Sequence, residues 1–322
     1  MVRTSQLLGM GLLVFLMSLL ISLPLQAQEK VVYGTSTGGG IRFVTDIIKA
    51  RNMDKRNGID LDFKYFAGPK GNAALILGKV DASYFNPYLA AKQTNEGIHF
   101  VNFEIQMNSH ISVLKPKGSP IRSVDELKGK KFGFIPRSSS TYFTFKIMMA
   151  MKGVDADKEF NMIIGNPFAL KAFIIRKDVD ASIHFEPFST LMLLNGEAEQ
   201  VAWFEDMWAR ATNGKPLLFS TLGARKSWID AHPKAARGLA RTIGEARAWI
   251  IANPDEALEL GNKALNIKSP RVKAALKKRM LRIYKTPWNQ QAIDAGNWQL
   301  KKAVELEILK KMPDKPVLAI LK

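Results

Sequence analysis

Hydrophobic and polar residues alternate along the chain in two matching series of strands and helices. Each series predicts a strand, a loop of small polar residues, a helix, a second strand, a turn with proline, a second helix and a short strand. In the first series the first helix runs from about Ile41 to Ala50 and the second strand from Leu61 to Phe66. In the second series the corresponding segments are Tyr142 to Lys152 and Phe160 to Ile164. Strands that alternate with helices predict parallel sheets covered on both faces.

The two series are copies of one sequence pattern. Positions 79–87 have the sequence KVDASYFNP and positions 178–187 have DVDASIHFEP, which places Asp81 and Asp180 99 residues apart. Tyr33-Gly34 and Phe132-Gly133, in the two first strands, keep the same offset. Repetition at a constant offset predicts that one supersecondary unit is used twice.

The pattern in the C-terminal third of the chain predicts that this part packs on the first unit. Leu217–Leu222 is a predicted strand, and a long helix follows from about Pro233 to Asn253-Pro254. This part has too few strands for a sheet of its own, so we expect it to pack on the first lobe. The predicted division is a signal segment at 1–27, a discontinuous lobe 1 at 28–114 plus 215–322, and lobe 2 at 115–214, with crossings at Leu114–Lys117 and Asn213–Leu217.

The N-terminal segment has the layout of a secretory signal. Arg3 is the only charged residue before Glu29, and Leu7 to Leu23 is almost wholly apolar. We expect cleavage near Ala27; the alternative is an uncleaved anchor, for which this segment is short. The chain contains no cysteine, so we predict a periplasmic protein without disulfides or a lipid anchor on an N-terminal cysteine.

The chain is strongly basic, with a formal net charge of +18. This charge fits a nucleic-acid or acidic-membrane partner, attraction of anionic ligands, or a solvated basic surface. We expect no nucleic-acid partner, because an exported protein rarely meets nucleic acid. The densest basic run, Lys268–Lys285, predicts a helix with one solvated face and one buried face, the latter formed by Val272, Ala275, Leu276, Met280 and Ile283.

Six loops of small polar and aromatic residues follow the predicted strands. Ligands of such sheets bind outside the carboxyl ends of the strands, so three loops from each copy are expected at one mouth. The loops are Thr35–Gly40, Gly68–Gly71, Tyr84–Tyr88, Arg137–Thr141, Asn166–Phe168 and Phe185–Phe188. The run Arg137–Thr141 suits an anion, because a helix start has unpaired N–H groups and partial positive charge, to which hydroxyls add donors. The alternative is that one serine merely caps the helix.

Other candidate residues have a structural alternative as well. Glu186 is suited to bind a ligand amine, to cap a helix or to pair with a lysine. The aromatic residues at the mouth form either a ligand wall or ordinary core: Tyr84, Phe85, Tyr88, Tyr142 and Phe185. The four histidines, His99, His110, His184 and His232, lack metal-ligand spacing, so we expect structural or surface roles and no metal site.

Two of the short motifs that mark nucleotide-binding enzymes and metalloproteases, G-x-x-x-x-G-K-[ST] and H-E-x-x-H, are absent. The G-x-S-x-G pattern of hydrolases occurs once, at Gly34–Gly38, in the Gly/Ser/Thr loop after the first predicted strand. An enzyme and a membrane-surface protein that uses the basic C-terminal part remain the competing classes. We expect a binding protein without enzymatic activity.

These motifs resemble the periplasmic substrate-binding proteins of ABC importers, in the branch for sulfonates, nitrate, taurine and thiamine-pyrimidine precursors. The resemblance covers about residues 30–260. It rests on the Gly/Ser/Thr loop after the first strand, Gly78–Ala82 (G-x-VDA), SVDELKGKKFGF at 123–134, and VDAS followed by Glu186-Pro187. The branch often has tryptophan where this chain has Phe185. A pyrimidine-synthesising relative depends on a cysteine-rich stretch, which this chain lacks.

The resemblance implies an α/β fold of the type II periplasmic binding protein class, with two doubly wound lobes joined by two hinge crossings. It implies a monomer without a cofactor, which captures a small anionic solute such as a sulfonate, taurine or nitrate and delivers it to the membrane permease of an ABC importer. An aromatic or pyrimidine-type solute and a TRAP-type transporter are the alternatives. The implied ligand contacts are Ser36, Thr37, Tyr84, Phe85, Asn86, Ser138, Ser139, Ser140, Thr141 and Glu186, to which the loops at the same mouth add Gly38 and Asn166.

Overall fold

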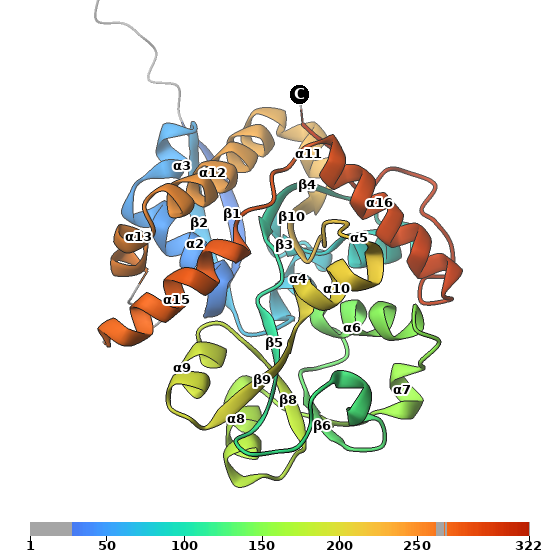
Figure 1. Ribbon diagram of the computed structural model, residues 1–322. Helices are drawn as coiled ribbons and strands as arrows, with labels where there is room; N and C mark the ends of the chain where they lie inside the picture. Colours follow the sequence, from blue (N-terminus) through green and yellow to red (C-terminus); the bar gives the residue numbers. More distant parts are fainter. Residues whose placement is uncertain (1–27, 262–266, 268, 322) are drawn as a thin grey trace, which may run out of the picture.

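Two five-stranded sheets form the centres of two lobes (Figure 1). The computed structural model describes residues 28–261, 267 and 269–321, so the predicted signal segment at 1–27 lies outside the described residues. The first sheet has the order β2 (Ile59–Phe66), β1 (Glu29–Ser36), β3 (Ala82–Phe85), β10 (Ser220–Arg225), β4 (Phe100–Met107). The second has the order β7 (Asn161–Ile164), β6 (Lys131–Phe134), β8 (Ala181–Phe185), β5 (Ile111–Pro116), β9 (Ala198–Trp203).

The sheets are mixed rather than wholly parallel, which corrects the sequence prediction. In the first sheet β10 runs antiparallel to β3 and β4, and in the second β5 runs antiparallel to β8 and β9. Both strands enter from the other lobe. The two lobes face each other through the carboxyl ends of their parallel strands. A strand that comes from the other lobe therefore enters the sheet at this edge and runs antiparallel to its neighbours.

The internal repeat has a structural basis in its aspartate. The N–H of Asp81 donates to the Val32 carbonyl at 2.9 Å, and Asp81 Oδ2 accepts from the Val32 N–H at 2.7 Å. Asp180 forms the same pair of bonds with Lys131, both at 2.9 Å. The VDAS motif therefore joins the short third strand of each unit to its first strand, and its role is structural.

Helices cover both sheets. Those of the first lobe are α2 (Gly39–Ala50), α3 (Met53–Arg56), α4 (Lys70–Ile76), α5 (Pro87–Asn95), α11 (Lys226–Ala231), α12 (Pro233–Ala252), α13 (Pro254–Leu260) and α16 (Gln290–Glu305). Those of the second are the 3-10 turn η1 (Val124–Leu127), α6 (Ser140–Ala150), α7 (Ala156–Glu159), α8 (Pro167–Arg176), α9 (Phe188–Leu194) and α10 (Phe204–Thr212). The predicted helices correspond to α2, α6 and α12, with ends that agree within two residues.

The C-terminal part returns to the first lobe, as the sequence predicted. Strand β10 lies between β3 and β4, helix α12 packs on β4 and α2, and α16 packs on α5. Near the C-terminus, Leu318 forms a bridge with Asn102. No helix among the described residues is both long and apolar enough to span a membrane.

The first crossing between the lobes differs from the prediction. Leu114–Pro116 lies inside β5, and the chain crosses between the sheets at Asn108–His110, just after β4. The second crossing leads from the end of α10 at Thr212 to the start of β10 at Ser220, which includes the predicted Asn213–Leu217. The limits of the two lobes as independently folding domains stay a prediction.

The predicted basic helix is α15 (Pro270–Ile283), which begins after Lys268, a residue outside the described part. Its buried residues are Val272, Leu276, Met280 and Ile283, as predicted, with Ala275 half-buried. The prediction that its basic face is solvated is wrong for Arg279, whose side chain is mostly buried against Glu186 of the second lobe. The side chain of Arg282 remains partly exposed to solvent, as predicted, while it pairs with Asp206 of the second lobe.

Candidate functional site

The loops that follow the strands of the first lobe lie close together, as the sequence predicted. The Thr37 N–H donates to the Phe66 carbonyl at 3.0 Å, which ties the loop after β1 to the end of β2. The buried Tyr84 hydroxyl, at the end of β3, donates to the Gly68 carbonyl at 2.6 Å. Three loops of this lobe therefore meet at one edge of the first sheet.

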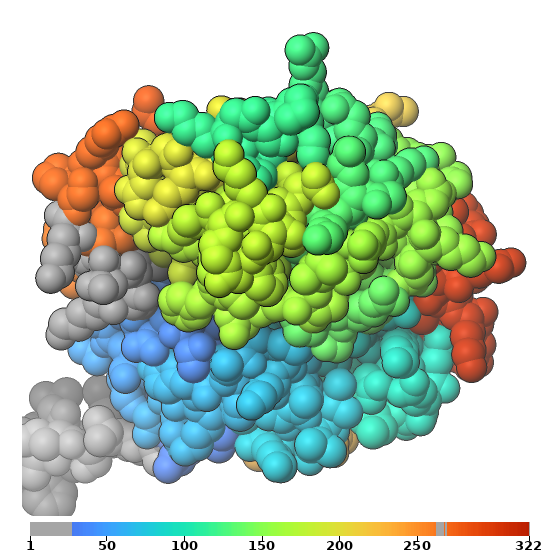
Figure 2. All heavy atoms as spheres, turned by 90° about the horizontal axis from the view of Figure 1, so that it is seen from below, coloured from blue at the N-terminus to red at the C-terminus, as the bar shows by residue number. Residues whose placement is uncertain are grey.

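The second lobe meets this edge directly. Asn86 Nδ2 donates to Ser140 Oγ at 2.7 Å, and the Tyr88 and Phe143 rings stack with centroids 4.1 Å apart. A Cβ added at Gly39 would lie 3.4 Å from the Phe185 ring. The lobes are in contact along the face seen from below, the second lobe green to yellow and the first blue (Figure 2). The two predicted mouths face each other.

The hydroxyls at Ser138–Thr141 have different surroundings. Ser139 is the N-cap of α6 and accepts from the Tyr142 N–H at 3.2 Å. Ser140 is the partner of Asn86, Thr141 is buried, and Ser138 is exposed. The capping alternative therefore accounts for Ser139, and a contact between the lobes accounts for Ser140.

Three more of the predicted site residues are bound within the protein. Asn166 Oδ1 caps α8 by accepting from the Phe168 and Ala169 N–H groups, each at 3.0 Å. Asn86 Oδ1 likewise caps α5 and accepts from the Leu89 N–H at 2.7 Å. The Phe85 ring packs on Phe100 in the core of the first lobe, with centroids 5.1 Å apart.

The loop after β1 leaves the start of α2 without a side-chain cap. Gly38 is the N-cap residue, and its N–H donates to Ser36 Oγ at 3.3 Å. Thr37 is exposed, and a Cβ added at Gly38 would meet nothing within 4 Å.

Glu186 is fully buried and bonded on both carboxylate oxygens. Oε2 accepts from the Thr190 N–H at 3.2 Å and from its hydroxyl at 2.6 Å, while Oε1 accepts from Arg279 Nε. Arg279 also donates to Gln200 at 3.0 Å and to Ser112 at 2.8 Å. Glu186 therefore binds the first turn of α9 through Thr190 and forms an ion pair. Two of its three predicted roles are thus found, with arginine in place of the lysine that we expected.

His110, in the first crossing, is a candidate site residue, although the sequence led us to expect only a structural or surface role for it. Its ring stacks on Phe185 with centroids 5.3 Å apart and meets Phe219 edge-on at 6.2 Å. Only 7% of the residue is exposed, and its Nδ1 has no hydrogen-bond partner. Burial lowers the pKa of His110 to about 3, so the ring is neutral at physiological pH. The clue in the sequence was a polar triplet, Asn108–His110, between two apolar strands.

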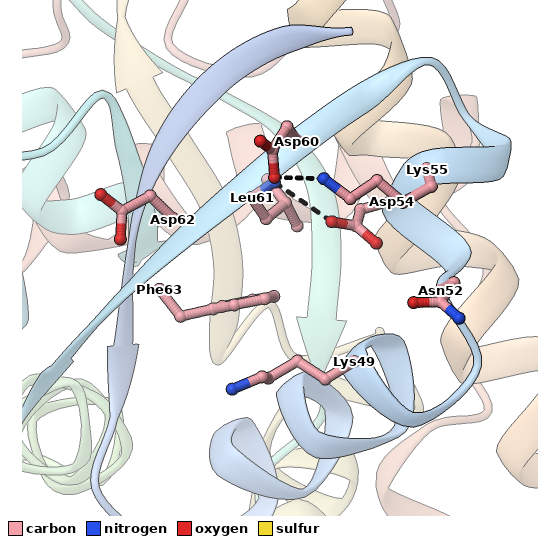
Figure 3. Close-up of a pocket in the computed structure, with 8 residues that line it drawn as sticks. All are labelled: Lys49, Asn52, Asp54, Lys55, Asp60, Leu61, Asp62 and Phe63. Atoms are coloured by element: carbon pink, nitrogen blue, oxygen red, sulfur yellow. Dashed lines mark hydrogen bonds and ion pairs between the residues drawn. The ribbon is translucent and has the colours of Figure 1, made fainter.

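A surface pocket of about 370 Å³ lies at the other end of the first lobe (Figure 3). It is formed by the end of α2, by α3 and by the first part of β2, away from the carboxyl ends of the strands. Lys55 pairs with Asp60, and Asp54 Oδ2 accepts from the Leu61 N–H at 3.1 Å. Its acidic groups are thus already bound, and the pocket is separate from the junction of the lobes. Within the described ranges, no three His, Cys, Asp or Glu residues gather in a way suited to a metal ion.

Comparisons with known proteins give a family and a fold. The family model described as NMT1/THI5 like matches residues 54–257. No curated protein sequence matches the chain.

Among solved structures, the alkanesulfonate-binding protein SsuA from Xanthomonas axonopodis pv. citri bound to MOPS has a TM-score of 0.72 and 16% identity, covering 90% of this chain and 98% of that one. The periplasmic aliphatic sulphonate binding protein SsuA from Escherichia coli has a TM-score of 0.67 and 19% identity, covering 89% and 95%. The periplasmic nitrate-binding protein NrtA from Synechocystis PCC 6803 has a TM-score of 0.66 and 15% identity, covering 87% and 82%. At these identities the similarity shows a shared two-lobe α/β fold.

Proposed function

The chain belongs to the NMT1/THI5-like family, and from that membership we propose that it is a periplasmic receptor that binds a small anion between its lobes. The solved structures with the same fold include binding proteins for sulfonates and for nitrate. They are binding proteins rather than enzymes, and the present chain has the role of a receptor without a catalytic step.

The observation that supports this function best is the convergence of the two mouths. The loops after β1 and β3 of one lobe meet the start of α6 and the end of β8 of the other, through the Asn86–Ser140 hydrogen bond and the Gly39–Phe185 approach. The starts of α2 and α6 both lie at this junction, and helix starts favour negatively charged groups. The basic charge of the chain attracts anions over a longer range.

The solute class we propose is a sulfonate, taurine or nitrate, and the partner is the permease of an ABC importer. A second candidate is an aromatic or pyrimidine-type solute, because the rings of His110, Phe185 and Phe188 meet at the same junction. A TRAP-type transporter is the alternative partner.

A thermal-shift screen of the purified mature protein tests the solute class. The ligands are methanesulfonate, MOPS, taurine, nitrate and a pyrimidine, with chloride at equal ionic strength as the control. A ligand present at about 100 times its Kd adds about 2.7 kcal/mol to the free energy of unfolding. We expect a rise in Tm with at least one of the anions. A rise with the pyrimidine alone would support the second candidate, and no rise with any of them would contradict the proposed solute classes.

A further inference from the structure

The first turn of α2 has backbone N–H donors that no side chain caps. The first N–H groups of a helix have no carbonyl partner within the helix. The N-cap residue of α2 is Gly38, which has no side chain to accept them, and the first turn contains no acidic residue. With 12 residues, α2 is long enough for the partial positive charge of its start to attract an anion.

His110 is directed at this helix start. A Cβ added at Gly40 would lie 3.5 Å from His110 Nδ1, and one added at Gly39 would lie 3.6 Å from its Cε1. The ring is held in place by Phe185 of the second lobe and Phe219. Glycines in the first turn of α2 therefore leave room for the imidazole to lie against it.

The Nδ1 atom of His110 is buried without a partner. A buried polar atom without a hydrogen bond costs free energy, so most such atoms in folded proteins have one. The ring is neutral, because burial lowers the pKa of His110 to about 3. It is therefore suited to donate one hydrogen bond from Nδ1 without adding a full positive charge beside the helix start.

We propose that His110 Nδ1 and the first-turn N–H groups of α2 together bind one oxygen-bearing group of the solute, a sulfonate, carboxylate or nitrate. This inference rests on the proposed function and deepens it, because it assigns the anion to the start of α2 rather than to Ser138–Thr141. At the start of α6, Ser139 already accepts a first-turn N–H. The stack of His110 on Phe185 links the anion to the second lobe.

Calorimetric titration of the mature protein with methanesulfonate, taurine and nitrate tests the inference. His110→Phe keeps a ring against Phe185 and removes both nitrogens, so we expect Kd to rise at least tenfold. His110→Asn keeps a polar group near the position of Nδ1, so we expect it to bind more tightly than His110→Phe. The matched control is His184→Gln, because His184 is also buried with an unpartnered Nδ1 but lies in the second lobe, where its Nε2 bonds Ser182. We expect the control to bind like wild type.

A second measurement does not depend on whether His110→Phe folds. The chain has four histidines, so ¹⁵N-labelled histidine gives few ring resonances. We expect one Nδ1 resonance, absent in His110→Asn, to shift when the probe that binds is added. If wild type binds a probe and neither that resonance nor the affinity of the His110 variants changes, the inference is wrong and the proposed function stands. If wild type binds none of the three anions, the anion function and this inference both fail.

Discussion

Side chains with oxygen atoms at the starts of helices serve here as helix caps. Ser139, Asn86 and Asn166 each accept from an N–H group of the first turn of a helix. A sequence pattern cannot separate this use from ligand binding, because both uses need the same residue types at the same position. The predicted ligand contacts at Ser138 and Thr141 stay predictions from the sequence, and the anion site inferred above lies at the start of α2 instead.

The cap at Ser139 leads to a prediction about stability. Ser139→Ala should lower the free energy of unfolding of the ligand-free protein by about 1 kcal/mol, because the Tyr142 N–H loses its acceptor. Urea unfolding at constant pH measures this difference. Ser138→Ala is the control, and we expect a change within about 0.5 kcal/mol because its side chain is exposed. Equal stability of Ser139→Ala and wild type would show that the cap contributes nothing.

At the scale of elements, α15 connects the two lobes apart from the chain crossings. It packs against α13 of the first lobe and α9 of the second. In Figure 2 it is orange and lies beside the yellow part of the second lobe. At its C-terminal end, the Ile283 carbonyl accepts from the Asn108 N–H at 2.6 Å, and the Tyr284 hydroxyl donates to the Gly40 carbonyl at 2.9 Å. On the second lobe, the Arg279 guanidinium lies 4.4 Å from the centre of the Trp203 ring. The helix thus joins the crossing, the start of α2 and the second lobe.

The pair between Arg279 and Glu186 leads to a prediction about this helix. Arg279→Ala leaves the fully buried Glu186 carboxylate without its cation, so the free energy of unfolding should fall by about 3–5 kcal/mol. Chemical unfolding is the measurement. Lys278→Ala, an exposed neighbour on the same helix, should change it by less than about 0.5 kcal/mol.

A double variant separates the loss of charge pairing from a general loss of packing. Arg279→Met with Glu186→Gln removes both charges, so it should recover part of the stability lost in Arg279→Ala. Equal losses in both variants would mean that the ion pair is not the cause.

The sequence was sufficient for most elements and insufficient for the crossing. The 99-residue repeat predicted that one unit is used twice, and Asp81 and Asp180 make the same bonds to the first strand of each unit. The first crossing was misplaced because Asn108–His110 contains no glycine or proline to mark a turn between two apolar strands. The partner of Glu186 could not be predicted either, because Arg279 lies 93 residues further along the chain, on a helix with several basic residues.

At the scale of the whole molecule, two crossings and α15 determine how the lobes can move. The lobes are held together at their junction by contacts such as the Asn86–Ser140 hydrogen bond and the stacked rings of Tyr88 and Phe143. Individual contacts of this kind contribute about 1 kcal/mol each. A solute that binds groups from both lobes adds free energy to the closed arrangement only, and therefore shifts the population towards it.

The last prediction is that a bound solute closes the molecule. Small-angle scattering should show a smaller radius of gyration when the protein is saturated with the anion that the thermal-shift screen identifies. A more local measurement uses the absence of cysteine, because spin labels on cysteines introduced at the exposed positions Lys79 and Lys177, one on each lobe, attach only there. We expect the distance distribution between the labels to narrow and shift on binding, and to shift less in His110→Phe at the same anion concentration. The prediction is wrong if the solute binds while the radius of gyration and the distances between the labels stay the same. The anion would then be bound without the hinge motion that the two short crossings permit.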